Sequence, residues 1–238
     1  MIISHSKQFI FLKPRKTAST SVEIALSTFC TQDDIVTKIS PQDEVMRQHI
    51  GGQPGKDIVK SLNEWTLKDC SRLMLRQKMP KRLVNHEPAA SVRKYVGEEM
   101  WNSYTKISME RNPWDKFISM YYWNIRNLAV KPTMLDYLNT IKDNTERLSN
   151  WNIYAIGDQV CADIILRYEH INEDLAQLAE QLNLGGLKLP NFKAKSGIRP
   201  ITQKYQEVIT PELNRELSKI CRREIHHFKY ALNTRYID

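Results

Sequence analysis

Residues 13 to 21 combine cations with hydroxyl side chains. The segment reads Lys-Pro-Arg-Lys-Thr-Ala-Ser-Thr-Ser and supplies three cations and four hydroxyls. It lies between an apolar run at 8–12, which favours a buried strand, and 19–28, whose apolar spacing favours a helix. At such a junction, unpaired N–H groups and the positive end of the helix dipole favour binding of an anion such as phosphate. A solvated turn with an ordinary Ser/Thr cap is the alternative interpretation.

A second junction of this kind begins at Arg111. Asn112 is a suitable N-cap and Pro113 suits the first helical position, so a helix should begin directly after the arginine. Ser119 comes eight residues after Arg111 and can lie near the same face. An arginine fork at a helix N-terminus is again suited to an anion. The alternative is an arginine that pairs with its acidic neighbours, Glu110 or Asp115.

Two anion sites at the ends of neighbouring strands would suit a nucleotide that carries phosphates at two separate positions. The chain contains no D-x-D pair to hold Mg²⁺, and no obvious strand ends in an aspartate for that purpose. Its first glycine is Gly51, so neither GxGxxG nor GxxxxGK[ST] can occur at the first junction. We therefore expect the nucleotide to be bound without a metal.

Composition sets wider limits. The chain has 238 residues, a net charge of +8 and 41% hydrophobic residues, which is typical of a globular protein, and we expect one domain over residues 1–238. The apolar stretch 9–12 is too short to span a membrane. The four cysteines include no CxxC pair, so a reducing cytoplasm is the expected location. The positive charge would suit nucleic acid, an acidic glycan or a phosphorylated cofactor.

The elements that must position these junctions alternate between strands and helices. Such alternation predicts an α/β fold, a P-loop-like central and mainly parallel sheet flanked by helices on both faces. Ligands of such sheets bind at the carboxyl ends of the strands, where both junctions lie. Residues 33–58 are expected to cross the surface. The predicted strands are 8–12, 105–109 and 163–168, and the predicted helices are 19–28, 61–77 (burying Trp65, Leu73 and Met74), 89–104, 113–127, 172–182 and one from 210 to 228.

The motifs at these junctions resemble those of sulfotransferases. Residues 16–21, Lys-Thr-Ala-Ser-Thr-Ser, are similar to the 5′-phosphosulfate loop of that family, and 111–119, Arg-Asn-Pro-Trp-Asp-Lys-Phe-Ile-Ser, to its 3′-phosphate motif. Residues 165–169 resemble its late Arg-Tyr-Glu strand and 205–230 its C-terminal region. The resemblance therefore covers nearly the whole chain. Two departures concern the loop: Arg15 stands where many members have proline, and no glycine is present.

The resemblance implies a donor, 3′-phosphoadenosine 5′-phosphosulfate (PAPS), and no metal. It implies that Arg111 and Ser119 bind the 3′-phosphate and that Lys16 stabilises charge on the leaving oxygen. Further residues that bind PAPS are expected in the loop and in a basic segment that closes over the nucleotide. That segment could also be a solvated loop. The expected residues are Arg15, Lys16, Thr17, Ala18, Ser19, Thr20, Ser21, Lys195, Ser196 and Arg199.

Transfer to a hydroxyl also needs a general base. In the branch that resembles uronyl and heparan 2-O-sulfotransferases, the base is a histidine about 25 residues before the arginine motif. His86 stands 25 residues before Arg111, and the resemblance therefore implies that it is the base. Glu87 is the rival base, and a capping or structural role for His86 is the alternative.

The acceptor is expected to be a hydroxyl on a glycan, with a small alcohol or a lipid-linked sugar as alternatives. A P-loop-type phosphotransferase and a basic nucleic-acid-binding module are the competing functions. The missing glycines and Mg²⁺ carboxylates argue against the first, and no RNA-binding aromatic pattern supports the second. We expect no nucleic-acid partner and no membrane span, and we predict a cytoplasmic, bacterial-type enzyme.

Overall fold

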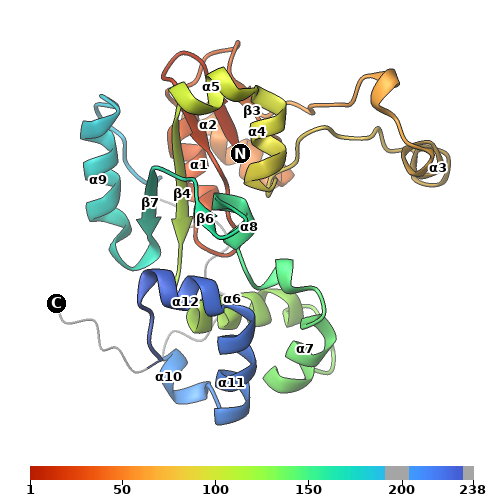
Figure 1. Cartoon of the computed structure of the whole chain (residues 1–238), viewed down its shortest axis with the longest axis vertical. Helices are drawn as coiled ribbons and strands as arrows, with labels where there is room; N and C mark the ends of the chain where they lie inside the picture. Colours follow the sequence, from red (N-terminus) through yellow and green to blue (C-terminus); the bar gives the residue numbers. More distant parts are fainter. Residues whose placement is uncertain (191–203, 233–238) are drawn as a thin grey trace.

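A computed structural model describes residues 1–190 and 204–232 and shows a mixed α/β fold (Figure 1). Its main sheet has the strand order β3-β1-β2-β4-β7. β2, β4 and β7 are parallel neighbours, whereas β1 is antiparallel to both β2 and β3. The strands are β1 (Ile2–Ser4), β2 (Phe9–Phe11), β3 (Ile35–Val36), β4 (Thr105–Glu110) and β7 (Ile164–Arg167), and β5 (Ala155–Ile156) and β6 (Gln159–Val160) form a separate hairpin.

Helices surround this sheet. The α-helices are α1 (Ser19–Ser27), α2 (Pro41–His49), α3 (Leu67–Arg76), α4 (Ala89–Val96), α5 (Glu98–Ser103), α6 (Pro113–Ile125), α7 (Met134–Ile141), α8 (Trp151–Tyr154), α9 (Ile171–Gln181), α10 (Tyr205–Val208), α11 (Pro211–Ile220) and α12 (Arg222–Phe228). Short 3₁₀ turns are η1 (Leu62–Glu64), η2 (Thr145–Arg147) and η3 (Tyr168–His170).

The two faces of the sheet are covered by different helices because strand side chains alternate between faces. Phe9 and Phe11 of β2 belong to a core cluster with residues of α1 and α9. Ile10 and the following Leu12 belong to another cluster with residues of α4, α5 and α8. The expected sheet with helices on both faces is thus confirmed, and so is the parallel pairing of the three predicted strands. The antiparallel β1 and β3 were not predicted, since three and two residues leave little periodicity to detect.

A third cluster lies beyond the carboxyl ends of the strands. It joins α6, α7, α10 and α11, whose group is drawn below β4 in Figure 1. Trp114 of α6 is buried in it and donates its indole N–H to Asn214 Oδ1 at 2.9 Å. This tryptophan therefore belongs to the core.

Two predicted helices are each divided in the structure. The segment 89–104 forms α4 and α5, which are separated at Gly97, whose φ of +81° suits glycine. The C-terminal segment forms α11 and α12, which meet at Cys221. The apolar periodicity continues across both breaks, so periodicity alone did not show them.

The segment 33–58 does not simply cross the surface. It contributes β3 to the sheet edge, and α2 packs against α1. Arg47 of α2 is fully buried and pairs with Glu23 of α1 at 2.8 Å. A buried ion pair hides this contact from a hydropathy pattern, because both residues are polar.

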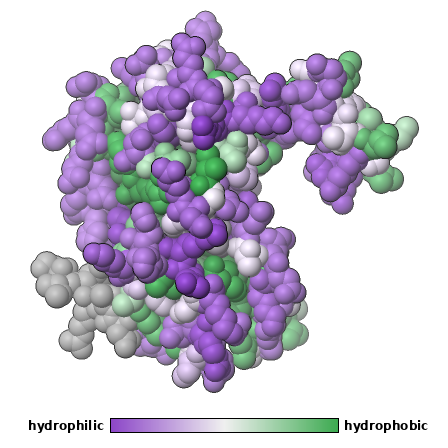
Figure 2. All heavy atoms as spheres, in the orientation of Figure 1, coloured by the Kyte–Doolittle hydropathy of each residue, from purple (hydrophilic) through white to green (hydrophobic). Residues whose placement is uncertain are grey.

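The helix predicted over 61–77 starts only at Leu67, after the 3₁₀ turn η1, and it projects from the body of the molecule (Figure 1). Met74, expected in the core, is 86% exposed, and Trp65 and Leu73 are only partly buried. Figure 2 shows apolar side chains at the tip of this projection. The prediction was wrong here because the apolar face of α3 has no other element against it in the described chain.

Candidate active site

The first junction is a loop with an unusual backbone at the carboxyl end of β2. Lys16 and Ala18 both have positive φ, 60° and 62°, and Ala18 is the N-cap of α1. Such left-handed residues next to a helix N-terminus make a concave group of N–H donors that suits an anion. The loop has no glycine, so two non-glycine residues adopt the left-handed backbone conformation, at a conformational cost.

We expect Ala18→Gly to stabilise the protein. An alanine in the left-handed region costs about 1–2 kcal/mol, and glycine removes this cost. Glycine also makes the unfolded chain more flexible, which lowers the stability by about 0.5–1 kcal/mol and offsets part of the gain. The free energy of unfolding in urea should therefore rise by roughly 0.5–1 kcal/mol. Ala90→Gly on α4, where alanine is helical, is the matched control and should lose stability. A loss with Ala18→Gly as well would contradict the strain at this position.

The hydroxyls of the loop have different roles. Thr17 is fully buried, and its Oγ1 has no hydrogen-bond partner within the described residues. Ser19 Oγ donates to the Pro14 carbonyl at 2.7 Å and so closes the loop on itself. Thr20 and Ser21 are buried in the first turn of α1. A buried hydroxyl without a partner is costly, and a phosphosulfate oxygen at the loop would satisfy Thr17. The unpaired Thr17 hydroxyl therefore fits the binding of PAPS, the expected sulfuryl donor.

The three cations of the loop point to different places. The Lys13 ammonium is buried and paired with Glu23, so it is a structural cation. The Arg15 guanidinium donates to the Glu146 carbonyl at 3.2 Å. Lys16 Nζ lies 5.0 Å from the ring centroid of Trp123 in α6. Lys16 is therefore the cation of this loop that faces α6, the helix that follows the second junction.

Arg111 joins the two junctions directly. It follows β4, and its Nη1 donates to the Lys16 carbonyl at 3.3 Å. Asp115 holds the same guanidinium through two contacts of 2.7 and 2.6 Å. The acidic-neighbour pairing considered as an alternative therefore does occur, at the same time as the contact with the loop. As predicted, Asn112 caps α6 by accepting from the N–H groups of Trp114 and Asp115.

Two aromatic residues complete this part of the site and were not singled out from the sequence. Tyr168, directly after β7, stacks under Arg111, whose guanidinium carbon lies 3.9 Å from the ring centroid. Trp123 of α6 faces Lys16. Ser119 is half-buried two turns into α6. Tyr168 stands inside the Arg-Tyr-Glu motif, so its signal was available, whereas nothing in the sequence marks Trp123.

His86 is hydrogen-bonded to the same loop, at Lys13. Its Nδ1 lies 3.0 Å from the Lys13 carbonyl oxygen. A carbonyl can only accept, so Nδ1 carries the hydrogen and Nε2 is the nitrogen with a free lone pair. Burial lowers the pKa of His86 to about 3, and the charges of Lys13 and Arg15 act in the same direction. The ring is therefore neutral at pH 7. Glu87 accepts from the Val84 N–H at 3.1 Å.

Two cavities open beside His86, and both are lined by His86 and Arg15. The smaller, about 260 Å³, is also lined by Lys38, Lys56 and Lys81 with Asp57 as its carboxylate. The larger, about 1020 Å³, runs along α8 and α12 and is also lined by Glu87. An acceptor that fills either cavity would reach the histidine. Lys195, Ser196 and Arg199 lie outside the described residues.

Within residues 1–190 and 204–232, no group of three or more His, Cys, Asp or Glu side chains is arranged to hold a metal. In the same residues no helix is both long and apolar enough to cross a membrane. The absence of a metal and the cytoplasmic location stay predictions.

Comparisons with known proteins found a matching family, a related sequence and a similar structure. A model described as the sulfotransferase family matches residues 1–231. An uncharacterised protein of Archaeoglobus fulgidus is 28% identical over 107 residues, which cover 41% of this chain and 82% of that protein. The crystal structure of mouse sulfotransferase SULT7A1 complexed with PAP is similar with a TM-score of 0.48 and 15% identity, over 96% of this chain and 91% of that one. Since the family match spans nearly all of the sequence, the chain belongs to the sulfotransferase family.

Proposed function

We propose that the protein transfers a sulfuryl group from PAPS to a hydroxyl of a glycan, with His86 as the general base and Lys16 as the cation that stabilises the leaving group. The observation that carries the proposal is the meeting of three strand ends. Arg111 after β4 contacts both the Lys16 carbonyl after β2 and the Tyr168 ring after β7. His86 is hydrogen-bonded to the same loop at Lys13.

The residues divide into three tasks. Arg111 and Ser119 would hold the 3′-phosphate, and the N–H groups of residues 17–21 with the Thr17 hydroxyl would hold the 5′-phosphosulfate. PAPS, when bound, supplies the sulfuryl group and an anionic phosphate as the leaving group. Lys16 would neutralise the charge that develops on that phosphate. Arg15, which lines both cavities, would face the acceptor side of the sulfuryl group.

His86 would remove the acceptor proton. Its Nε2 carries the free lone pair because Nδ1–H is held by the Lys13 carbonyl. As the acceptor oxygen forms its bond to sulfur, its proton passes to Nε2, and the bond between sulfur and the leaving phosphate oxygen breaks. The fixed Nδ1 contact orients the ring throughout this step.

The acceptor side supports a polar, hydroxyl-rich molecule. The cavity of about 1020 Å³ has room for a sugar residue. The smaller cavity brings three lysines beside His86, and only Asp57 opposes them, through contacts of 2.9 Å to Lys38 and 2.6 Å to Lys81. This excess of positive charge would suit an anionic group on the acceptor.

Thermal unfolding with three ligands tests the proposal. Adenosine 3′,5′-bisphosphate (PAP), the product left by the donor, should raise the melting temperature by about 5 °C or more at 100 times its dissociation constant. ATP–Mg²⁺ and an oligoribonucleotide should cause smaller shifts. Stabilisation by ATP–Mg²⁺ alone would favour a phosphotransferase, and stabilisation by the oligoribonucleotide alone would favour a nucleic-acid-binding module.

A further inference from the structure

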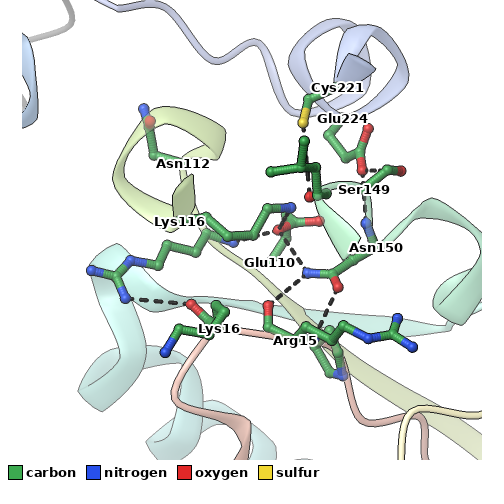
Figure 3. A network of polar contacts seen from close by, with 12 residues as sticks. Arg15, Lys16, Glu110, Asn112, Lys116, Ser149, Asn150, Cys221 and Glu224 are labelled. Atoms are coloured by element: carbon green, nitrogen blue, oxygen red, sulfur yellow. Dashed lines mark hydrogen bonds and ion pairs between the residues drawn. The ribbon is translucent and has the colours of Figure 1, made fainter. Parts of the chain in front are cut away.

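A buried asparagine grips the loop that precedes Lys16. The Arg15 N–H donates to Asn150 Oδ1 at 2.9 Å, and Asn150 Nδ2 donates to the Arg15 carbonyl at 3.0 Å (Figure 3). One side-chain amide thus satisfies both backbone groups of one loop residue. Asn150 is 1% exposed and lies far from Arg15 in the sequence, so this clamp exists only in the folded chain.

The asparagine is itself held from behind by α12. Glu224 Oε1 accepts from the Asn150 backbone N–H at 2.9 Å and from Ser149 Oγ at 2.6 Å. Glu224 is fully buried. These bonds fix the turn that presents the Asn150 side chain, so the clamp is a supported structure.

A carboxylate at the end of β4 lies between the clamp and the second junction. Glu110 Oε1 is 3.5 Å from Asn150 Nδ2, and it accepts from the Arg111 backbone N–H at 2.9 Å. Lys116 of α6 pairs with the same oxygen at 2.9 Å, and Tyr154 donates to Oε2 at 2.6 Å. Figure 3 shows this network between the loop and α12. The buried Glu110 carboxylate therefore connects the backbones of both arginines: it contacts Arg111 directly and Arg15 through Asn150.

We propose that Asn150 is a positioning residue that pre-forms the 5′-phosphosulfate site and holds it in register with Arg111. This inference rests on the proposed function. Arg15 directly precedes Lys16, whose positive φ must be maintained for the loop to stay concave. Without the clamp the loop would have to be ordered by the ligand, and ordering a loop lowers affinity. Asparagine suits the task because its amide offers one acceptor and one donor at the required positions.

The test compares two ligands by calorimetry. PAP reaches both phosphate sites, whereas adenosine 3′-monophosphate lacks the 5′-phosphate, so the ratio of their dissociation constants reports the loop alone. In Asn150→Ala we expect the preference for PAP to fall by about 10-fold, since two hydrogen bonds are lost. Affinity for the 3′-monophosphate should change less than about 2-fold. Asn102→Ala, an exposed asparagine on α5, is the matched control and should keep the wild-type ratio.

The outcomes separate the two proposals. A wild-type protein that does not prefer PAP would overturn the proposed function together with the clamp. A wild-type preference that survives in Asn150→Ala would overturn the clamp alone, as would an equal loss for both ligands. If the variant does not fold, amide hydrogen exchange of the wild type decides. The Arg15 N–H should be protected without ligand, and protection that arises only with PAP would contradict a pre-formed site.

Discussion

Replacement of His86 by alanine should lower turnover by about 10²–10⁴-fold, the usual contribution of a general base. The affinity for PAP should stay nearly unchanged, because His86 contacts the Lys13 carbonyl and faces the acceptor cavities. Turnover is measured with a saturating donor and a glycan acceptor, and PAP binding by calorimetry. The two measurements separate the loss of a base from the loss of the donor site.

Two variants serve as controls. His49→Ala removes an exposed histidine from α2 and should leave turnover unchanged. Glu87→Gln tests the rival base beside His86. Unchanged turnover in His86→Ala, with a large loss in Glu87→Gln, would move the base to the glutamate.

The pH profile gives an independent check on His86. With a pKa of about 3, the free enzyme keeps His86 neutral as the pH falls through the ordinary histidine value of 6.5. Protonation therefore begins only well below that value, and kcat/KM should show no loss from this group between pH 8 and 5. A decrease centred near pH 6.5 would contradict the lowered pKa of His86.

Replacement of Lys116 by methionine should destabilise the protein by about 3–5 kcal/mol, because it leaves Glu110 charged and buried without its cation. Burial, the largest single effect, would lower the pKa of Lys116, but the charges of Glu110, Glu224 and Cys221 together with the hydrogen bond to Glu110 outweigh it and the net pKa is raised. The lysine is therefore charged in the folded protein. Urea unfolding at pH 7 measures the loss.

A second substitution distinguishes lost charge balance from lost packing. Adding Glu110→Gln removes the stranded charge and should recover part of the stability. Lys68→Met on the exposed face of α3 is the matched control and should have little effect. If Lys116→Met has the same free energy of unfolding as the control, the buried pair of Lys116 and Glu110 does not stabilise the protein as its burial implies.

Local patterns were sufficient for the parts of the fold that repeat with a clear period. The strands at 8–12, 105–109 and 163–168 alternate or run as apolar stretches, and they form adjacent parallel strands. The N-cap at Asn112 could also be predicted from neighbouring residues alone, since asparagine followed by proline suits the start of a helix. Periodicity failed for α3, whose apolar face meets no other element among the described residues, and for α2, which is held by the buried pair of Arg47 and Glu23.

The sequence by itself determined the parallel strands β2, β4 and β7, the helix that follows each of them and the family, because residue type and spacing along the chain carry that information. Only the tertiary structure decided which cation of the loop faces α6. Lys13 is taken by Glu23, whereas Lys16 lies beside Trp123. It also decided that Asn150 clamps Arg15. Such contacts join residues far apart in the chain, and buried polar groups must find partners that no local pattern specifies.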